Sequence, residues 1–307
     1  MQLRCLVYIF LAFLLSKGKL YASATNRAVS PMLPTLFLAH GGGPLPILGD
    51  AAHAELSSSL RGIPAKHLKM KPKHIIVISA HWESDSRDIV QISTGNPKGE
   101  LLYDYYGFPP QAYAPHLMYN VKGALELATK TSKVLSNSFE KVEIVNRGFD
   151  HGVFVPLKLM FPQAEIPVIQ VSLIGGLDPS NHIKLGKALA ELREGDKDTL
   201  IVGSGMSFHN MQAFRVSGGI NQNMQKSLAF HEYLKSTIEG VEPPAMLERL
   251  ASWEEAPEAR FCHPREEHLL PLHVAAAAAG ANAQGKTIYD GTLMGVKVAS
   301  FLFRPSQ

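Results

Sequence analysis

Lys73-His74-Ile75-Ile76-Val77-Ile78-Ser79-Ala80-His81-Trp82-Glu83 is an apolar run that leads to a histidine. Its four consecutive β-branched residues, with no Gly or Pro among them, predict a strand buried on both faces, as in the middle of a parallel or mixed sheet. Ligands of open α/β sheets bind outside the carboxyl ends of the strands. His81 is therefore expected at a functional edge of the sheet.

An apolar run that leads to a histidine occurs twice more in the chain. Residues 34–44 read as a short apolar strand, then His40, then a glycine-rich turn, and residues 200–205 form a strand that leads to His209. A helix predicted over Gly49–Arg61 and closed by Ile63-Pro64 separates the first two strands, and this order is typical of a βαβ unit. No long linker divides the chain, so we expect one α/β domain.

The first residues differ from the rest. A short positive start, an apolar run from Leu6 to Leu15 and a small-residue site near Ala24 indicate a secretory signal peptide or another targeting segment over residues 1–24. The expected α/β domain then spans residues 25–307. This predicts the secretory pathway or an organelle as the location, and the cytoplasm if the segment is not used.

Composition limits the partners. The chain of 307 residues has 30 Lys+Arg against 27 Asp+Glu, and three of these basic residues precede Thr25. The remainder is close to neutral, which argues against nucleic acid or an acidic membrane surface as a partner. The leader's apolar run is shorter than the about 20 residues that span a bilayer, so no stable membrane insertion of the mature chain is expected. The sequence does not specify the oligomeric state.

The histidines are the residues that best indicate the chemistry of this protein. Several strand-end histidines in one chain predict a metal site, because three imidazoles, or two with a carboxylate, around an open position form a catalytic centre. Other chemistries fit less well: the Gly41–Gly43 turn has no following Gly-Lys-Ser/Thr, and Gly203-Ser204-Gly205 is not a nucleophile elbow. The aromatic loop 103–110 is either a surface loop packed by its own rings or a lid with flat walls for a planar ligand.

Six short blocks occur in order along residues 33–303. The blocks are Leu38-Ala39-His40-Gly41-Gly42, Ser79-Ala80-His81-Trp82, Tyr106-Gly107-Phe108-Pro109, Gly148-Phe149-Asp150-His151-Gly152, Phe208-His209-Asn210, and His263-Pro264 with Glu267-His268 and Pro271-Leu272. Together they resemble the class III extradiol ring-cleavage dioxygenases, in the branch typified by 4,5-DOPA extradiol dioxygenase.

The resemblance implies a single-domain three-layer α/β/α sandwich with a central mixed sheet. It implies one divalent metal, Fe²⁺ for turnover or Zn²⁺, held by His40, His81 and His268. His209 is either a fourth ligand or the acid/base, and His151 is a second acid/base near the substrate. The implied reaction opens the ring of a DOPA-like catechol with O₂ to give a semialdehyde. The aromatic residues expected to wall the ring are Tyr105, Tyr106 and Phe108.

Two departures from the branch bear on the substrate. Gly-Gly-Gly-Pro follows His40 where the branch usually has Gly-Ser-Pro, and Arg265-Glu266 stands where Thr-Pro is usual. Two other functions use similar residues: a non-catalytic metal-binding protein of the Memo type, and a zinc-dependent hydrolase whose metal would activate water.

Overall fold

The computed structural model describes residues 32–215 and 220–305. The predicted targeting segment, residues 1–24, lies outside them. In chain order the elements are β1 (Thr35–Ala39), α2 (Leu45–Leu48), η1 (Ala51–His53), α3 (Ala54–His67), β2 (His74–Glu83), β3 (Ile89–Ser93), η2 (Pro110–Ala112), α4 (Leu125–Leu135), β4 (Lys141–Val145), α5 (His151–Met160), β5 (Val168–Leu173), α6 (Pro179–Glu194), β6 (Thr199–Gly205), α7 (Met211–Arg215), α8 (Ile220–Gly240), α9 (Pro243–Ala251), η3 (Trp253–Glu255), α10 (Ala259–Cys262), α11 (Leu270–Ala278), β7 (Gln284–Leu293) and β8 (Val296–Arg304).

The strands of the described ranges form one mixed sheet of eight, in the order β4-β3-β5-β2-β6-β1-β8-β7. The central strands β5, β2, β6 and β1 are parallel, whereas β8 is antiparallel to β1 and β3 is antiparallel to β5. Parallel central strands point their carboxyl ends to one edge. The three strand-end histidines predicted from the sequence therefore share that edge.

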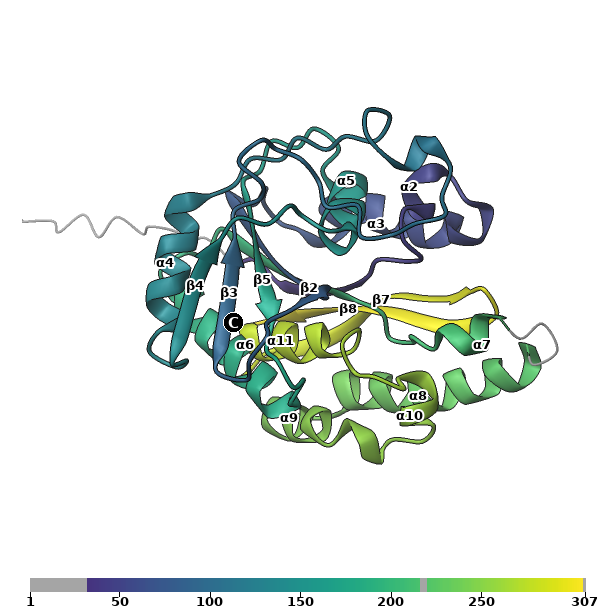
Figure 1. Cartoon of the computed structure of the whole chain (residues 1–307). Helices are drawn as coiled ribbons and strands as arrows, with labels where there is room; N and C mark the ends of the chain where they lie inside the picture. The colour runs from purple at the N-terminus through teal and green to yellow at the C-terminus, as the bar shows by residue number, and fades with distance from the viewer. Residues whose placement is uncertain (1–31, 216–219, 306–307) are drawn as a thin grey trace, which may run out of the picture. The chain divides into compact units, whose positions relative to one another are not determined.

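Helices cover both faces of the sheet, with α3 and α5 on one side and α6 and α11 on the other (Figure 1). Strand β2 shows why both faces must be covered: Ile76 and Ile78 pack in one core cluster, and Ile75 and Val77 pack in the other. Successive side chains of a strand point to opposite faces, so a run of four apolar residues needs a helical layer on each side. The predicted three-layer α/β/α sandwich is confirmed.

Two elements continue beyond their predicted ends. Strand β2 runs through His81 to Glu83, although its regular pairing with β6 stops at Ser79 and its register with β5 shifts after Ile78. His81 thus lies on an extension of the strand past the regular ladder. Helix α3 continues through Pro64, which was expected to end it, because Pro64 lies in the last turn and its carbonyl still accepts from the N–H of Leu68.

None of the helices in the described ranges is both long and apolar enough to cross a membrane.

Three buried histidines other than the strand-end histidines give a pH prediction. Burial lowers the pKa of His182 and of His273 to about 4 and that of His263 to about 3. The unfolded chain binds these protons from about pH 6.5 downward, whereas the native state stays neutral. The free energy of unfolding should therefore fall by about 2 kcal/mol per histidine between pH 6.5 and 5. Urea unfolding at the two pH values measures the loss.

A matched variant isolates one histidine. His182 accepts a hydrogen bond from the N–H of Ile174 and donates one to the carbonyl of Asp178, and a Gln side chain can make both bonds without titrating. His182→Gln should reduce the loss of unfolding free energy between pH 6.5 and 5 by about 2 kcal/mol, the share of one histidine. An unchanged slope would show that His182 is not protonated on unfolding in this range.

Candidate metal centre

Close packing at the carboxyl edge brings His268 to the sheet. The N–H of Met206, just after β6, donates to the carbonyl of His268 over 2.9 Å. A Cβ atom on Gly205 would lie 2.1 Å from that carbonyl oxygen, and one on Gly203 would lie 2.1 Å from the carbonyl oxygen of Pro271. These two glycines of β6 therefore allow the turn before α11 to lie directly against the strand, with His268 beside the ends of β1 and β2.

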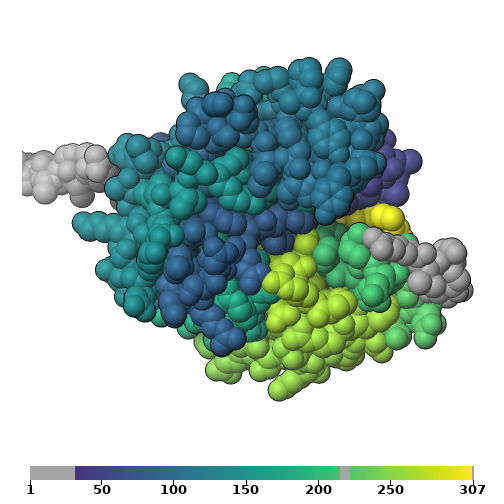
Figure 2. All heavy atoms as spheres, in the orientation of Figure 1, coloured from purple at the N-terminus to yellow at the C-terminus, as the bar shows by residue number. Residues whose placement is uncertain are grey.

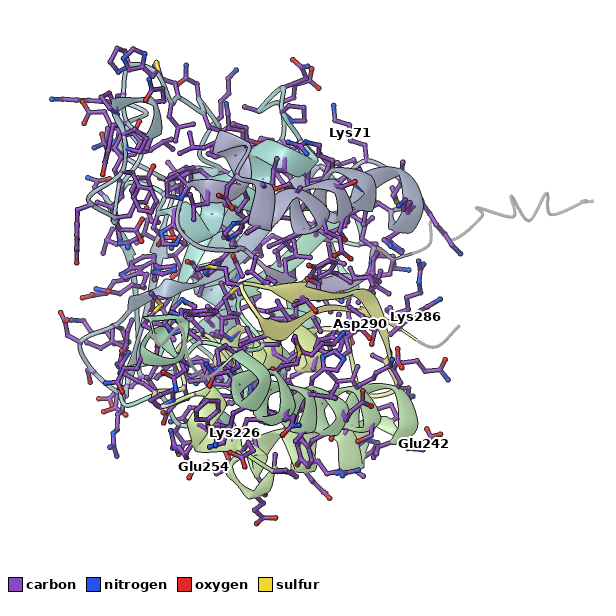
Figure 3. All side chains as sticks on the ribbon, turned by 90° about the vertical axis from the view of Figure 1, so that its right-hand side faces the viewer. Lys71, Lys226, Glu242, Glu254, Lys286 and Asp290 are labelled. Atoms are coloured by element: carbon purple, nitrogen blue, oxygen red, sulfur yellow. The ribbon has the colours of Figure 1, made fainter. Side chains whose placement is uncertain are left out.

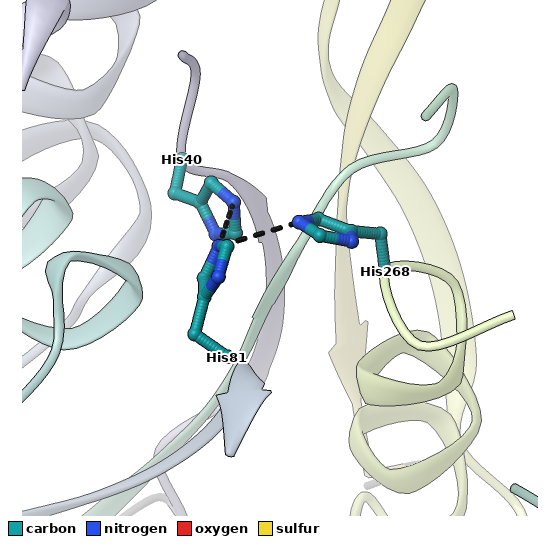
Figure 4. Close-up of side chains that lie close together, drawn as sticks. All are labelled: His40, His81 and His268. Carbon is teal, nitrogen blue, oxygen red and sulfur yellow. Dashed lines mark hydrogen bonds between the residues drawn. The ribbon is translucent and has the colours of Figure 1, made fainter. Parts of the chain in front are cut away.

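Three imidazoles converge at this edge. The Nε2 atom of His81 lies 3.2 Å from that of His40 and 3.3 Å from that of His268 (Figure 4). The structure thus brings together residues that are separated by up to 228 positions in the chain, the distance from His40 to His268. Figure 4 shows the three rings approaching from separate elements, with His81 between the other two.

The second ring nitrogen of each imidazole has its own oxygen partner. His40 Nδ1 lies 3.1 Å from the hydroxyl of Ser204, and that hydroxyl donates to the carbonyl of Gly152. His268 Nδ1 lies 2.9 Å from a carboxylate oxygen of Glu267, and His81 Nδ1 lies 3.5 Å from one of Asp104. An oxygen that accepts at Nδ1 places the proton there.

These tautomers leave three Nε2 lone pairs directed at one another. Burial first, and the neighbouring imidazoles second, lower the pKa of His40 and of His268 well below the ordinary value, and burial lowers the pKa of His81 to about 4. All three rings are neutral near pH 7. The lone pairs of three neutral Nε2 atoms that face one another repel, and a cation bound among them removes this repulsion. The residues therefore fit a divalent metal with three imidazole ligands.

A second pair of histidines flanks the trio. The ring of His151 lies 3.8 Å from that of His81, centroid to centroid, and the ring of His209 stacks on that of His268 at 3.3 Å. Asp104 accepts from the backbone N–H and from Nδ1 of His151, at 3.0 and 2.9 Å. Each flanking histidine therefore has its Nε2 free to accept a proton.

Two carboxylates link the flanking histidines to the ligands. Glu267 Oε1 lies 3.2 Å from His209 Nδ1 and also contacts His268 Nδ1, just as Asp104 contacts both His151 and His81. Burial raises the pKa of both carboxyls, but their bonds with the histidines outweigh it and the net pKa of each lies below its usual value. Neither Asp104 nor Glu267 was predicted to have a role in the site, because neither follows a strand; the available signal was their position beside Tyr105 and His268.

Removal of the negative charge of Asp104 or of Glu267 should weaken metal binding. Asp104→Asn presents an amide N–H₂ to an imidazole that needs an acceptor, and Glu267→Gln weakens the acceptor shared by His209 and His268. We expect each variant to bind the metal about 10 to 100 times more weakly, the usual effect of losing a partner behind a ligand. Competition with a chromogenic chelator measures the affinity. Glu165→Gln is the control, since Glu165 is exposed and its ion-pair partner is Lys71; equal affinity in all three variants would contradict the prediction.

The start of α5 is fixed by a buried ion pair. Asp150, which is fully buried, accepts from Arg147 at 2.8 Å and from the hydroxyl of Ser79 at 2.7 Å. Arg147 also donates to the carbonyl of His81 over 3.1 Å and lies over the ring of Trp82. One arginine thus joins the strand that carries His81 to the helix that begins at His151.

His53, which the sequence analysis gave no role, holds the turn after His40. Its Nδ1 donates to Asp50 over 2.6 Å, and its Nε2 accepts from the N–H of Gly42 over 3.0 Å. A Cβ on Gly41, whose φ is +82°, would meet Pro46 at 2.6 Å and His53 at 2.9 Å. The unusual Gly-Gly-Gly turn therefore lies in a space that admits no side chain at Gly41.

The three predicted wall residues lie in different surroundings. The ring of Tyr105 is buried with its centroid 5.8 Å from that of His151, and its hydroxyl donates to the carbonyl of Ala112. Phe108 is half-buried and packs against the ring of Tyr105 at 5.4 Å. Tyr106 is 88% exposed. Of the three, Tyr105 and Phe108 lie on the histidine side of the loop.

Comparison with known proteins identifies the family. The family model described as the catalytic LigB subunit of aromatic ring-opening dioxygenase matches residues 34–299. The chain belongs to this family. A 4,5-DOPA dioxygenase extradiol of Beta vulgaris is 36% identical over 269 residues, which are 85% of this chain and 93% of that protein. A dioxygenase of Hapsidospora irregularis is 34% identical over 284 residues, 88% of this chain and 85% of the relative.

The fold is also found among solved structures. A crystal structure of an uncharacterised protein from Escherichia coli K12 matches with a TM-score of 0.69 at 24% identity and covers 89% of this chain and 99% of that one. The LigB-family match and the similar relatives confirm the predicted class III extradiol dioxygenase of the DOPA branch. The chain is a non-haem, metal-dependent ring-opening dioxygenase, and the family favours this over the Memo-type protein and the zinc hydrolase.

Proposed function

We propose that this LigB-family dioxygenase uses Fe²⁺ to cleave the ring of a DOPA-like catechol and release a semialdehyde. The observation that carries the proposal is the arrangement of three neutral imidazoles with two further histidines beside them. A site with three ligands on one side leaves positions for substrate and dioxygen. Zinc binds the same donor set, so the choice of iron rests on the ring-opening chemistry.

His40, His81 and His268 would hold the metal through Nε2. When bound, ferrous iron supplies the redox chemistry that dioxygen needs and a positive charge that lowers the pKa of the catechol hydroxyls. The chain supplies proton acceptors on two sides. The Nδ1 atoms of His151 and His209 are engaged by Asp104 and Glu267, so each ring offers Nε2 to the substrate.

His209 is our candidate for the base that takes a catechol proton, and His151 for the second acid/base. A neutral imidazole suits this task near pH 7, because it can accept a proton and return it within one turnover. Tyr105 would contact the plane of the ring, since its own ring lies beside His151, and Phe108, which packs against Tyr105, would extend this wall. An aromatic wall holds a planar ring without supplying competing ligands.

One experiment tests the substrate and the metal together. The protein is loaded anaerobically with Fe²⁺ or Zn²⁺ in separate samples, mixed with catechol, DOPA or a monophenol control, and exposed to air. We expect oxygen uptake and the visible absorbance of a semialdehyde only with iron and an ortho-diol, strongest with DOPA. Turnover of other catechols but not DOPA would refute the DOPA-like assignment, and turnover with zinc would refute the iron assignment.

We further propose, from the sequence alone, that residues 1–24 direct the chain to the secretory pathway or an organelle. A fluorescent protein fused after Ala24 should leave the cytoplasm, while the same fusion without residues 1–24 should remain there. Cytoplasmic fluorescence of both fusions would refute the targeting role.

A further inference from the structure

A hollow separate from the histidine cluster lies between two loops. It has a volume of about 830 Å³ and lies between residues 94–101 and residues 114–123. These loops belong to the upper part of the molecule in Figure 1 and to the blue region of the face in Figure 2. None of the five histidines is among the described residues that line it. Small-molecule sites commonly have volumes of about 300 to 1,000 Å³.

Aromatic rings form the walls of this cavity. Tyr103, Tyr119 and Phe149 all line it. The hydroxyl of Tyr103 donates to the carbonyl of Leu117 over 2.6 Å, and that of Tyr119 donates to carbonyls of α5 and of the residue after it. Because both hydroxyls already have acceptors, the tyrosines offer ring surface to a ligand. Aromatic walls favour a planar apolar group.

Backbone geometry fixes the position of the Phe149 ring. Gly95 has a φ of +89°, and a Cβ at this position would lie 3.0 Å from the ring of Phe149. The ring thus packs directly on the backbone of the first loop. Phe149 is 3% exposed, so it backs the wall and little of its ring faces the cavity.

The side chains at the opening of the cavity determine which ligand charge it favours. Lys98 and Lys122 both line the cavity and both are exposed. Within residues 32–215 and 220–305, neither lysine has an ion-pair partner among the salt bridges of the structure. One acid lines the cavity, Glu100, and it accepts from the side chain of Asn96 over 3.2 Å. Two cations against one acid leave the mouth net positive near pH 7, which favours an anion.

A wall of two chain segments separates this cavity from the metal centre. Tyr103 directly precedes Asp104, and Phe149 lies two residues before His151. The N–H of Leu102 donates to the carbonyl of Phe149 over 2.9 Å and joins the two segments. The cavity and the histidine cluster therefore lie along the same two segments.

We propose that this cavity is a second small-molecule site, which binds an aromatic carboxylate. The ring would lie between Tyr103, Tyr119 and Phe149, and the carboxylate would lie at the mouth near Lys98 and Lys122. The proposal does not depend on which catechol the enzyme cleaves, because none of the residues that carry it holds the metal.

The probe is 3-phenylpropionate, with 3-phenylpropanol as its uncharged counterpart. Calorimetry on the full-length, metal-loaded protein under anaerobic conditions should show one site for the acid and at least tenfold weaker binding of the alcohol. The affinity should be unchanged by saturating catechol, and unchanged in the His81→Ala variant. These two results would place the site outside the metal centre.

Charge variants identify the cavity. Lys98→Ala with Lys122→Ala should weaken binding of the acid about tenfold, as expected for two exposed charges. The control is Lys71→Ala with Lys286→Ala, two exposed lysines that lie elsewhere and are labelled in Figure 3; it removes the same charge and should leave the affinity unchanged.

Four results would overturn the proposal. They are the absence of acid binding at millimolar concentrations, equal affinities of the acid and the alcohol, competition with catechol, and equal weakening by both pairs of lysine variants. Competition with catechol would instead make the cavity part of the substrate site, and equal weakening would indicate a general effect of net charge. Oxygen uptake plays no part in these measurements, so they succeed or fail independently of the ring-opening assay.

Discussion

Replacement of His81 by Ala is expected to leave the protein unable to retain its metal. His81 is the central member of the trio, with its Nε2 3.2 Å from that of His40 and 3.3 Å from that of His268. Loss of a direct ligand should cost more than the about 10 to 100-fold that is typical for a residue behind a ligand. Metal content after gel filtration, measured by mass spectrometry, and chelator competition should both show the loss, and turnover should fall with them.

His209→Ala is the matched comparison. The ring of His209 stacks on that of His268 at 3.3 Å, but its Nε2 is not among the three that converge. We expect this variant to keep most of its metal and to lose about 10² to 10⁴-fold in turnover, the range of a missing acid/base. Equal metal loss in the two variants would make His209 a ligand and would remove it as the candidate base.

Gly205→Ala should disrupt the metal centre without changing any of its histidines. The added methyl group would lie 2.1 Å from the carbonyl oxygen of His268, and Gly205 lies at the end of a central strand that cannot move aside. The turn before α11 must therefore move. We expect the free energy of unfolding to fall by about 3 kcal/mol or more, and the metal affinity to fall about 10 to 100-fold, as when the groups that orient a ligand are lost.

Urea unfolding and chelator competition measure the two effects separately, with affinity recorded at a temperature at which circular dichroism shows the variant to be folded. Gly240→Ala is the control, because Gly240 ends α8 and a Cβ there would meet nothing within 4 Å. A folded Gly205→Ala variant with unchanged metal affinity would show that the turn carrying His268 tolerates displacement.

Local sequence was sufficient for most of the fold. The run Ile75–Ile78 could only be a strand covered on both faces, because each of its side chains is apolar and neighbours alternate between faces. His40, His81 and His209 were recognisable because each follows an apolar run. Local rules were wrong at Pro64, since a proline in the last turn does not end a helix whose remaining bonds are intact.

The ligand role of His268 depended on family resemblance in the sequence, since no strand precedes it. Its place in the centre is set by β6, where two glycines admit the turn before α11. Asp104 and Glu267 could not be assigned from the sequence either. Each lies beside a residue already of interest, but a carboxylate that bridges two imidazoles is recognisable only when both imidazoles have been placed.

The sequence by itself determined an α/β domain with histidines at the carboxyl edge of its sheet, because hydrophobic periodicity and strand ends are local properties. The family resemblance implied the three layers and the ligand set, and only the tertiary structure shows the geometry of the five histidines: three with converging Nε2 atoms, and two beside them that share carboxylates with the other three. The physical reason is that tautomer and ring orientation depend on the partner of each Nδ1. Those partners, Ser204, Asp104 and Glu267, come from segments that only the folded chain brings together.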